Sequence, residues 1–206
     1  MPSDFFMPLA QYGVLVLFIA AMVGSPGPAN MSLMASGLAF GARPAVPFLL
    51  GTMSGFQMIF WLNVLGLYAL LQSAPEVFQL LRWMCIGYIL YLAWTIVRSG
   101  SRQAGRATRV PGFLRGFWVH PLNPKAYAMQ IAAISQFVSP DRYLADALLT
   151  SLTFWVVGGA LNGLWLVAGG KLRSATGNPS FLYTLQVVLA VVMVGSTIAS
   201  LQMIPP

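Results

Sequence analysis

Residues 24–28, which read Gly-Ser-Pro-Gly-Pro, have the composition of a helix break that exposes backbone hydrogen-bonding groups. Proline has no backbone N–H, so Pro26 leaves the carbonyl of Met22 without its helical donor, and Pro28 has the same effect two residues on. Gly27, between the two prolines, tolerates almost any backbone angle. The motif therefore predicts two half-helices with unpaired peptide groups between them.

Residues 120–125 read His-Pro-Leu-Asn-Pro-Lys and predict a second break of the same kind, because Pro124 also removes a helical donor. Each break begins a new half-helix, whose free N–H groups and positive dipole end can hold an anion such as a carboxylate. The freed carbonyls can accept hydrogen bonds from an ammonium, and Ser25, Asn30 and Asn123 add neutral polar contacts. Together the two motifs predict a pocket for a small zwitterion such as an amino acid.

The composition places these motifs in a membrane. Of the 206 residues, 58% are hydrophobic and 7% are charged, whereas a soluble domain carries roughly 25% charged residues. Apolar stretches long enough to cross a hydrocarbon core of about 30 Å recur along the chain. We therefore expect an all-α polytopic membrane protein with one transmembrane domain over residues 1–206. The six expected spans are 12–40, 45–71, 78–98, 114–138, 144–169 and 181–203.

Lys125 lies near the middle of the fourth expected span, which makes it a candidate functional residue. An ammonium at the bilayer centre costs about 2.5–3.5 kcal/mol on the insertion scale. We therefore expect its side chain to face the protein interior, where it could assist a carboxylate or exchange a proton. His120 is the other titratable candidate for proton coupling at this depth, although it could equally be an interfacial residue bonded to backbone.

Basic residues are concentrated in three of the five gaps between the expected spans. These gaps must share one side of a six-span protein, and they hold eight of the eleven Lys and Arg residues. They are Arg43, Arg98, Arg102, Arg106, Arg109, Arg115, Lys171 and Arg173. The positive-inside rule puts these gaps in the cytoplasm and both termini outside. The net charge of +7 is explained in this way without nucleic acid as a partner.

The two halves of the chain share one plan. Residues 1–98 and 114–206 each begin with a proline-broken span followed by two less interrupted ones, with the Arg-rich loop at 99–113 between them. A duplicated unit of three spans inserts its second copy upside down, as in many transporters. We therefore expect two inverted three-helix repeats. Glycine pairs at 51/55 and 159/163 have the spacing that lets helices approach closely, within the chain or in a homodimer.

Several chemistries lack the residues that they need. Cys85 is the sole cysteine, so neither a disulfide nor a thiolate metal site can form within the chain. No Asp or Glu lies deep in an expected span, which argues against a divalent-cation site and favours a neutral amino acid over a cationic one. We therefore expect no metal, no cofactor and no enzymatic activity. Asn63 and Asn162, in the middle spans of the two halves, could each reach a central cavity.

The chain resembles the LysE/RhtB family of amino-acid exporters. The likeness covers essentially the whole chain and depends on residues 24–28, on Asn-Pro-Lys-Ala at 123–126, and on Gln-Phe-Val at 136–138. It also includes the glycine-spaced run Gly37, Gly41, Gly51 and Gly55. His120 and Pro121 depart from the family pattern, which leaves open whether the substrate or the coupling differs.

The resemblance implies efflux of amino acids or close derivatives across the bacterial plasma (inner) membrane, driven by the proton gradient. It also implies which residues line the translocation site, namely Ser25, Pro26, Gly27, Pro28, Asn123, Pro124 and Lys125. The alternatives from other classes are a membrane channel, a membrane-embedded enzyme and an assembly protein. A channel would keep a continuous hydrated path, whereas a carrier that alternates its access would not.

Single-cysteine labelling tests the predicted orientation. In a background in which Cys85 is alanine, Arg106→Cys should react with a membrane-impermeant maleimide only from the cytoplasmic side. Glu76→Cys, in a gap on the opposite side, should react only from outside. If the impermeant maleimide labels Arg106→Cys in intact cells, the orientation is the opposite of the predicted one.

Overall fold

The computed structural model describes residues 7–100, 109–176 and 178–202, and every regular element in these ranges is a helix. In chain order the elements are α1 (Leu9–Gly24), α2 (Pro28–Phe40), α3 (Val46–Val64), α4 (Leu67–Ser73), α5 (Pro75–Gly100), α6 (Phe113–Phe117), α7 (Pro124–Phe137), η1 (Pro140–Arg142), α8 (Tyr143–Thr153), η2 (Phe154–Gly158), α9 (Gly159–Ala175) and α10 (Pro179–Gln202). The predicted all-α class is confirmed.

Several of these helices have the length and apolar composition of membrane spans. Pro75–Arg98, Pro140–Ala175 and Pro179–Leu201 each meet that test alone. The pair α1 and α2, bent by 58° at the first proline motif, meets it together. These elements make the chain a polytopic membrane protein. The count of six spans stays a prediction, because α3 and the α6–α7 pair fall outside the same test.

Two of the expected spans differ from the helices that form. The second ends at Val64 rather than at residue 71, because Gly66 takes a left-handed conformation with φ of 99° and α4 starts in a new direction after it. In the fourth, α6 has only five residues and is separated from α7 by turns over residues 118–122. Proline and glycine account for both interruptions.

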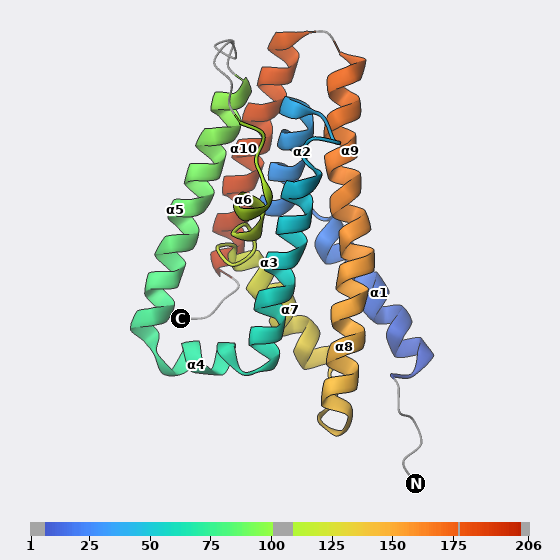
Figure 1. Cartoon of the computed structure of the whole chain (residues 1–206). Coiled ribbons are helices and arrows are strands. Elements are labelled where there is room, and N and C mark those ends of the chain that lie inside the picture. The colour runs from blue at the N-terminus through green and yellow to red at the C-terminus, as the bar shows by residue number, and fades with distance from the viewer. Residues whose placement is uncertain (1–6, 101–108, 177, 203–206) are drawn as a thin grey trace.

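Helix α2 occupies the middle of the bundle (Figure 1), where it packs along α9 and also contacts α10 and α5. Its residues 28–38 are all buried. A helix that is buried on every side needs no polar face, and α2 accordingly lacks an amphipathic pattern. The second half of the first broken helix is therefore a central element of the fold.

The basic connections lie at one end of the molecule. The α2–α3 connection, the C-terminal end of α5 and the α9–α10 connection all lie in the upper half of Figure 1, whereas α1, α4 and η1 lie in its lower half. Arg43 lies in the α2–α3 connection, Arg98 in the last turn of α5, and Lys171 and Arg173 near the C-terminal end of α9. Arg102 and Arg106 lie outside the described residues. The side of the membrane that this end of the molecule faces stays a prediction.

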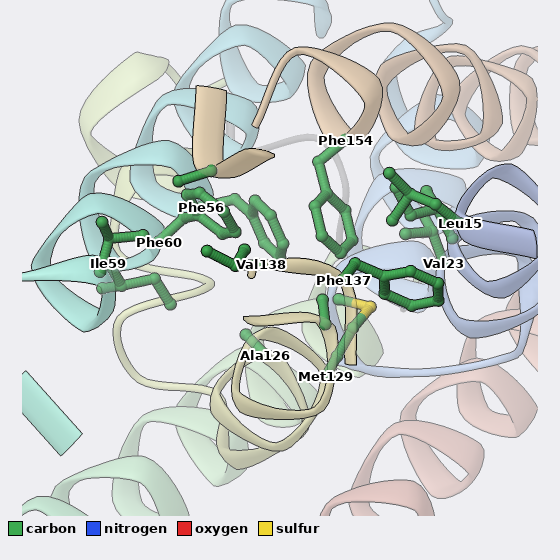
Figure 2. Packing of buried hydrophobic residues seen from close by; sticks show 14 of the residues in the cluster. Leu15, Val23, Phe56, Ile59, Phe60, Ala126, Met129, Phe137, Val138 and Phe154 are labelled. Atoms are coloured by element: carbon green, nitrogen blue, oxygen red, sulfur yellow. The ribbon is translucent and has the colours of Figure 1, made fainter. Parts of the chain in front are cut away.

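An aromatic and aliphatic core fills the space between α1, α3, α7 and the α8–α9 helix (Figure 2). The rings of Phe56 and Phe154 lie with their centroids 4.8 Å apart, and those of Phe60 and Phe154 lie 6.0 Å apart. Leu15, on α1, is fully buried in the same cluster. This core ties both halves of the chain together beside the proline breaks.

Glycines allow the closest helix contacts. A side chain at Gly51 or Gly55 would collide with the backbone of α6 at Phe113 or Phe117, so the predicted close approach at this pair is confirmed. At the second pair, a side chain at Gly159 would collide with the side chain of Met53 on α3, and one at Gly163 would make only an ordinary contact, so no backbone in the described part of the chain lies against this pair. The close approach of α9 occurs instead at Gly169, which meets the backbone of α2 at Met34 and Leu38.

Substitution of Gly51 by alanine should destabilise the protein, although alanine favours a helix by about 1 kcal/mol over glycine. The added methyl group must displace the α6 backbone, so we expect the melting temperature in detergent to fall by at least about 4 °C. The control is Gly87→Ala on α5, where a methyl group meets no atom within 4 Å and stability should not fall. An equal response of both variants would contradict the packing.

Candidate functional site

The two proline breaks meet at the side chain of Lys125. Its Nζ donates to Ser25 Oγ at 2.8 Å, to the Ser25 carbonyl at 3.0 Å and to the Pro26 carbonyl at 3.2 Å. Lys125 is in the first turn of α7, whereas both of its partners lie between α1 and α2. An ammonium has three N–H groups, so these partners use its donors fully. The structure thus brings together the two motifs that the sequence singled out.

Gly27 matters for a different reason from the one that its type suggested. Its φ of −170° and ψ of 175° are extended values that any residue can adopt, so freedom of the backbone is not what this position needs. A Cβ here would stand 3.0 Å from both Cδ and Nζ of Lys125. The glycine makes room for the lysine side chain.

Asn30 and Ser25 satisfy carbonyls within the first break. The Asn30 amide donates to the carbonyls of Val23, at 2.6 Å, and Ser25, at 2.9 Å. The hydroxyl of Ser25 donates to the carbonyl of Met22 at 2.9 Å, which is the group that Pro26 leaves without a helical donor. The broken backbone is held by side chains of its own motif together with Lys125.

The two new half-helices differ at their N-termini. At α7, the side chain of Asn123 caps the helix by accepting from the backbone N–H of Lys125 at 3.1 Å. At α2, the residue before the helix is Gly27, and no side chain caps the first turn. Pro28 at the first position has no N–H, so the remaining unpaired donors of this turn belong to Ala29 and Asn30. The N-terminus of α2 is the one open to an anion.

A pocket opens beside these groups, with about 500 Å³ of space not filled by atoms, including the part open to the outside. Its lining consists of Met22, Val23, Gly27, Pro28, Ala29, Asn30, Met53, Phe56, Gln57, His120, Asn123, Lys125, Ala126, Met129, Phe154, Trp155, Gly158, Gly159 and Asn162. These residues include no Asp or Glu. The pocket is a mostly apolar chamber with a few convergent polar groups, as is typical of small-molecule sites.

Of the remaining predicted residues, His120 and Asn162 line the pocket and Asn63 does not. His120 lies in the pocket lining and is buried, with its ring edge against Phe56 at a centroid distance of 5.0 Å, and its depth in the membrane stays a prediction. Asn162 also lines the pocket. Asn63 does not, because its amide donates to Gln130 Oε1 at 2.8 Å and links α3 to α7. Gln130 in turn donates to the carbonyl of Phe56 at 3.0 Å.

Two features of the pocket were not foreseen from the sequence. One is η2, a π-helical turn over Phe154–Gly158 that lies inside the long helix from α8 to α9 and lines the pocket. Such turns occur frequently at functional sites. The other is Gln57, whose amide exchanges hydrogen bonds of 2.9 and 2.6 Å with Ser151 on α8. The adjacent pair Gly158-Gly159 was a signal for an irregular helix here.

Comparison with known proteins identifies the family. A family model described as LysE type translocator matches residues 9–202. The chain belongs to the LysE type translocator family. Its role is accordingly that of a membrane transporter and not of an enzyme. Within the described ranges, no three His, Cys, Asp or Glu side chains lie together in a way that could hold a metal ion.

Curated relatives are similar over most of their length. The cysteine/O-acetylserine efflux protein of Salmonella typhimurium (strain LT2) is 28% identical over 152 residues, which cover 73% of this chain and 78% of the relative. The cysteine/O-acetylserine efflux protein of Escherichia coli O1:K1 is 29% identical over 146 residues, covering 70% and 75%. No solved structure gives a significant match to the chain.

Replacement of Asn30 by leucine should loosen the first break. The substitution removes two hydrogen bonds and leaves the buried carbonyl of Val23 without a donor, at a cost of about 2 kcal/mol. We expect the melting temperature in detergent to fall by roughly 4–8 °C. Ser36→Ala, which removes a hydrogen bond to the Ser32 carbonyl within α2, is the control. A smaller shift for Asn30→Leu than for the control would contradict this role.

Proposed function

We propose that the protein exports small neutral amino acids, or close derivatives, from the bacterial cytoplasm in exchange for protons. The observation that supports the proposal is that the Lys125 ammonium donates hydrogen bonds to the carbonyls of Ser25 and Pro26 at the first break. These carbonyls lie beside the uncapped N-terminus of α2. Both charged groups of an amino acid have a complementary partner there. The pocket that contains them has no carboxylate in its lining.

The carboxylate of the substrate is assigned to the N-terminus of α2. The first turn offers the N–H groups of Ala29 and Asn30, and the dipole of this 13-residue helix favours negative charge at that end. Gly27 carries no side chain beside this turn, and the three atoms nearest to the place of a Cβ there all belong to Lys125. The position suits an anion at membrane depth, where each fixed donor is worth more than in water.

The ammonium of the substrate is assigned to the carbonyls of Ser25 and Pro26, which Lys125 now occupies. These acceptors take one ammonium at a time, because two like charges this close repel strongly at low dielectric. The substrate can therefore bind there only when Lys125 is neutral and has moved away. We therefore assign to the substrate's amino group the place that the Lys125 ammonium takes in this structure.

This competition supplies the coupling. On the cytoplasmic side, Lys125 releases its proton and the substrate ammonium takes its place on the carbonyls. On the outer side, the substrate leaves and Lys125 accepts a proton from that side. One proton then enters for each amino acid that leaves. His120, the other candidate for this step, does not contact the carbonyls of the break in this structure, so we assign the proton to Lys125.

A neutral substrate fits the charges of the site. With no Asp or Glu in the lining, a cationic side chain would add an uncompensated positive charge near Lys125. The relatives are named for cysteine and O-acetylserine, and both of these amino acids have uncharged side chains. The proposal includes the orientation that the charge pattern predicts. The basic connections face the cytoplasm, and both termini lie on the outer side of the inner membrane.

Efflux from proteoliposomes tests the proposal. Vesicles loaded with labelled serine, alanine or lysine are diluted into a more acidic buffer, and efflux is compared with and without a protonophore. We expect gradient-dependent efflux of serine and alanine but not of lysine. Lys125→Ala should lower the gradient-dependent efflux at least about tenfold, the effect of losing 1.4 kcal/mol in the rate-limiting step.

Lys171→Ala is the matched control, because Lys171 is the other lysine of the chain and lies in α9 near its C-terminal end. Its efflux should stay within about twofold of the wild type, since surface charges contribute little. Unchanged efflux in Lys125→Ala would remove that residue from the site. If the protonophore does not change the efflux rate, the proposed exchange with protons is wrong, whereas export itself is still supported.

A further inference from the structure

Two side chains in the pocket carry buried polar atoms without a hydrogen-bond partner. They are Nδ1 of His120 and Oδ1 of Asn162, and each residue is only 6% exposed. An unsatisfied buried polar atom costs about 1–3 kcal/mol, so a stable protein keeps few of them. Both atoms belong to residues that line one pocket, which makes them candidates for contact with a bound molecule.

These two residues are separate from the groups assigned to the zwitterion. His120 belongs to the turns between α6 and α7, and Asn162 is on α9 next to the π-helical turn. Neither one hydrogen bonds to Ser25, Pro26 or Lys125. The carboxylate and ammonium of an amino acid already have partners elsewhere in the pocket. What remains for His120 and Asn162 is the substrate's side chain.

We propose that His120 and Asn162 form a side-chain subsite that selects amino acids with a short side chain bearing a hydroxyl or thiol over aliphatic ones of the same size. This inference rests on the proposed function. We assign Oδ1 of Asn162 to accept the hydrogen of the side-chain group and Nδ1 of His120 to be the second partner of the same group. Phe56, Phe154 and Met129 add apolar side chains to the lining of the same pocket, and Phe56 contacts the His120 ring.

The physical basis of the selection is the asymmetry of buried hydrogen bonds. A hydroxyl-bearing substrate pairs polar atoms that are otherwise unsatisfied, whereas an aliphatic one seals them away unpaired. Sites built to hydrogen-bond a hydroxyl reject the analogue that lacks it far more strongly than an apolar pocket rejects an extra methylene. Serine and alanine differ by this one oxygen, so their ratio of transport measures the subsite directly.

The chain provides a matched control in Gln186 on α10. Its Oε1 is also buried without a partner, and the residue is 2% exposed, but it does not line the pocket. Leucine is close in size to asparagine and is apolar, so both Asn162→Leu and Gln186→Leu remove an unsatisfied atom without creating another. The two variants should therefore have similar stability and differ only in their effect on selection.

The experiment measures counterflow of labelled serine and alanine in proteoliposomes, together with the melting temperature of each variant in detergent with either amino acid. We expect the wild type to prefer serine at least about tenfold, the equivalent of 1.4 kcal/mol. Asn162→Leu and His120→Phe should each lower the serine-to-alanine ratio at least fivefold, and serine should no longer raise their melting temperatures more than alanine does. Gln186→Leu should keep the wild-type ratio.

The outcomes separate this inference from the function on which it rests. If the wild type transports both amino acids equally, or if the ratio in Asn162→Leu and His120→Phe equals that of Gln186→Leu, the subsite is wrong and amino-acid export stands. If the wild type moves neither amino acid, the proposed function fails first. If one variant does not fold, the other and the ligand-dependent melting temperatures of the wild type decide.

Discussion

The ammonium group of Lys125 joins the two halves of this protein with three hydrogen bonds. These bonds lie where the first helix of each half is broken. Peptide groups that lose their helical partners at membrane depth must find others, since water is excluded there. The chain solves this with Lys125, Asn30 and the hydroxyl of Ser25. The buried position of α2, the room left at Gly27 and the cap at Asn123 all serve that arrangement.

The same arrangement explains why the pocket is positioned where it is. Each break turns the chain and separates two half-helices, and the space beside the turn is filled only in part by Phe56, Phe154 and Met129. The π-helical turn of the α8–α9 helix faces this space from the other half of the chain. Three irregular segments therefore surround one chamber, while the straight helices α5 and α10 pack outside it.

Much of the fold and of the site could be predicted because proline acts locally. Pro26, Pro28 and Pro124 remove donors whatever the tertiary structure, and the cost of an ammonium in the bilayer fixes Lys125 in the interior. What could not be predicted depends on packing between distant segments. Gly27 looks like a flexible hinge in sequence, yet its role is set by a lysine that lies 98 positions further along the chain.

Similar reasoning accounts for the other differences. In residues 154–158 only Gly158, next to Gly159, is a signal for an irregular helix, and it does not specify a π-helical turn, because such a turn also depends on neighbours that the sequence does not place. Asn63 and Asn162 lie in the middle expected spans of the two halves, but only the structure assigns the first to a helix link with Gln130 and the second to the pocket. The glycines at 159 and 163 have the right spacing, and the backbone contact occurs at Gly169 instead.

The dependence of the fold on one positive charge also constrains the proposed transport cycle. If both proton and substrate are absent, the carbonyls of Ser25 and Pro26 lose the hydrogen bonds from the ammonium, and a hydrogen bond to a charged group contributes about 1.5–3 kcal/mol. The Ser25 carbonyl then keeps only the amide of Asn30 as a donor. The empty neutral state is therefore the least stable one in which to cross between inward and outward forms. A carrier built on this site exchanges one positive group for another, and a leak of either alone is disfavoured by the same hydrogen bonds that hold the broken helices together.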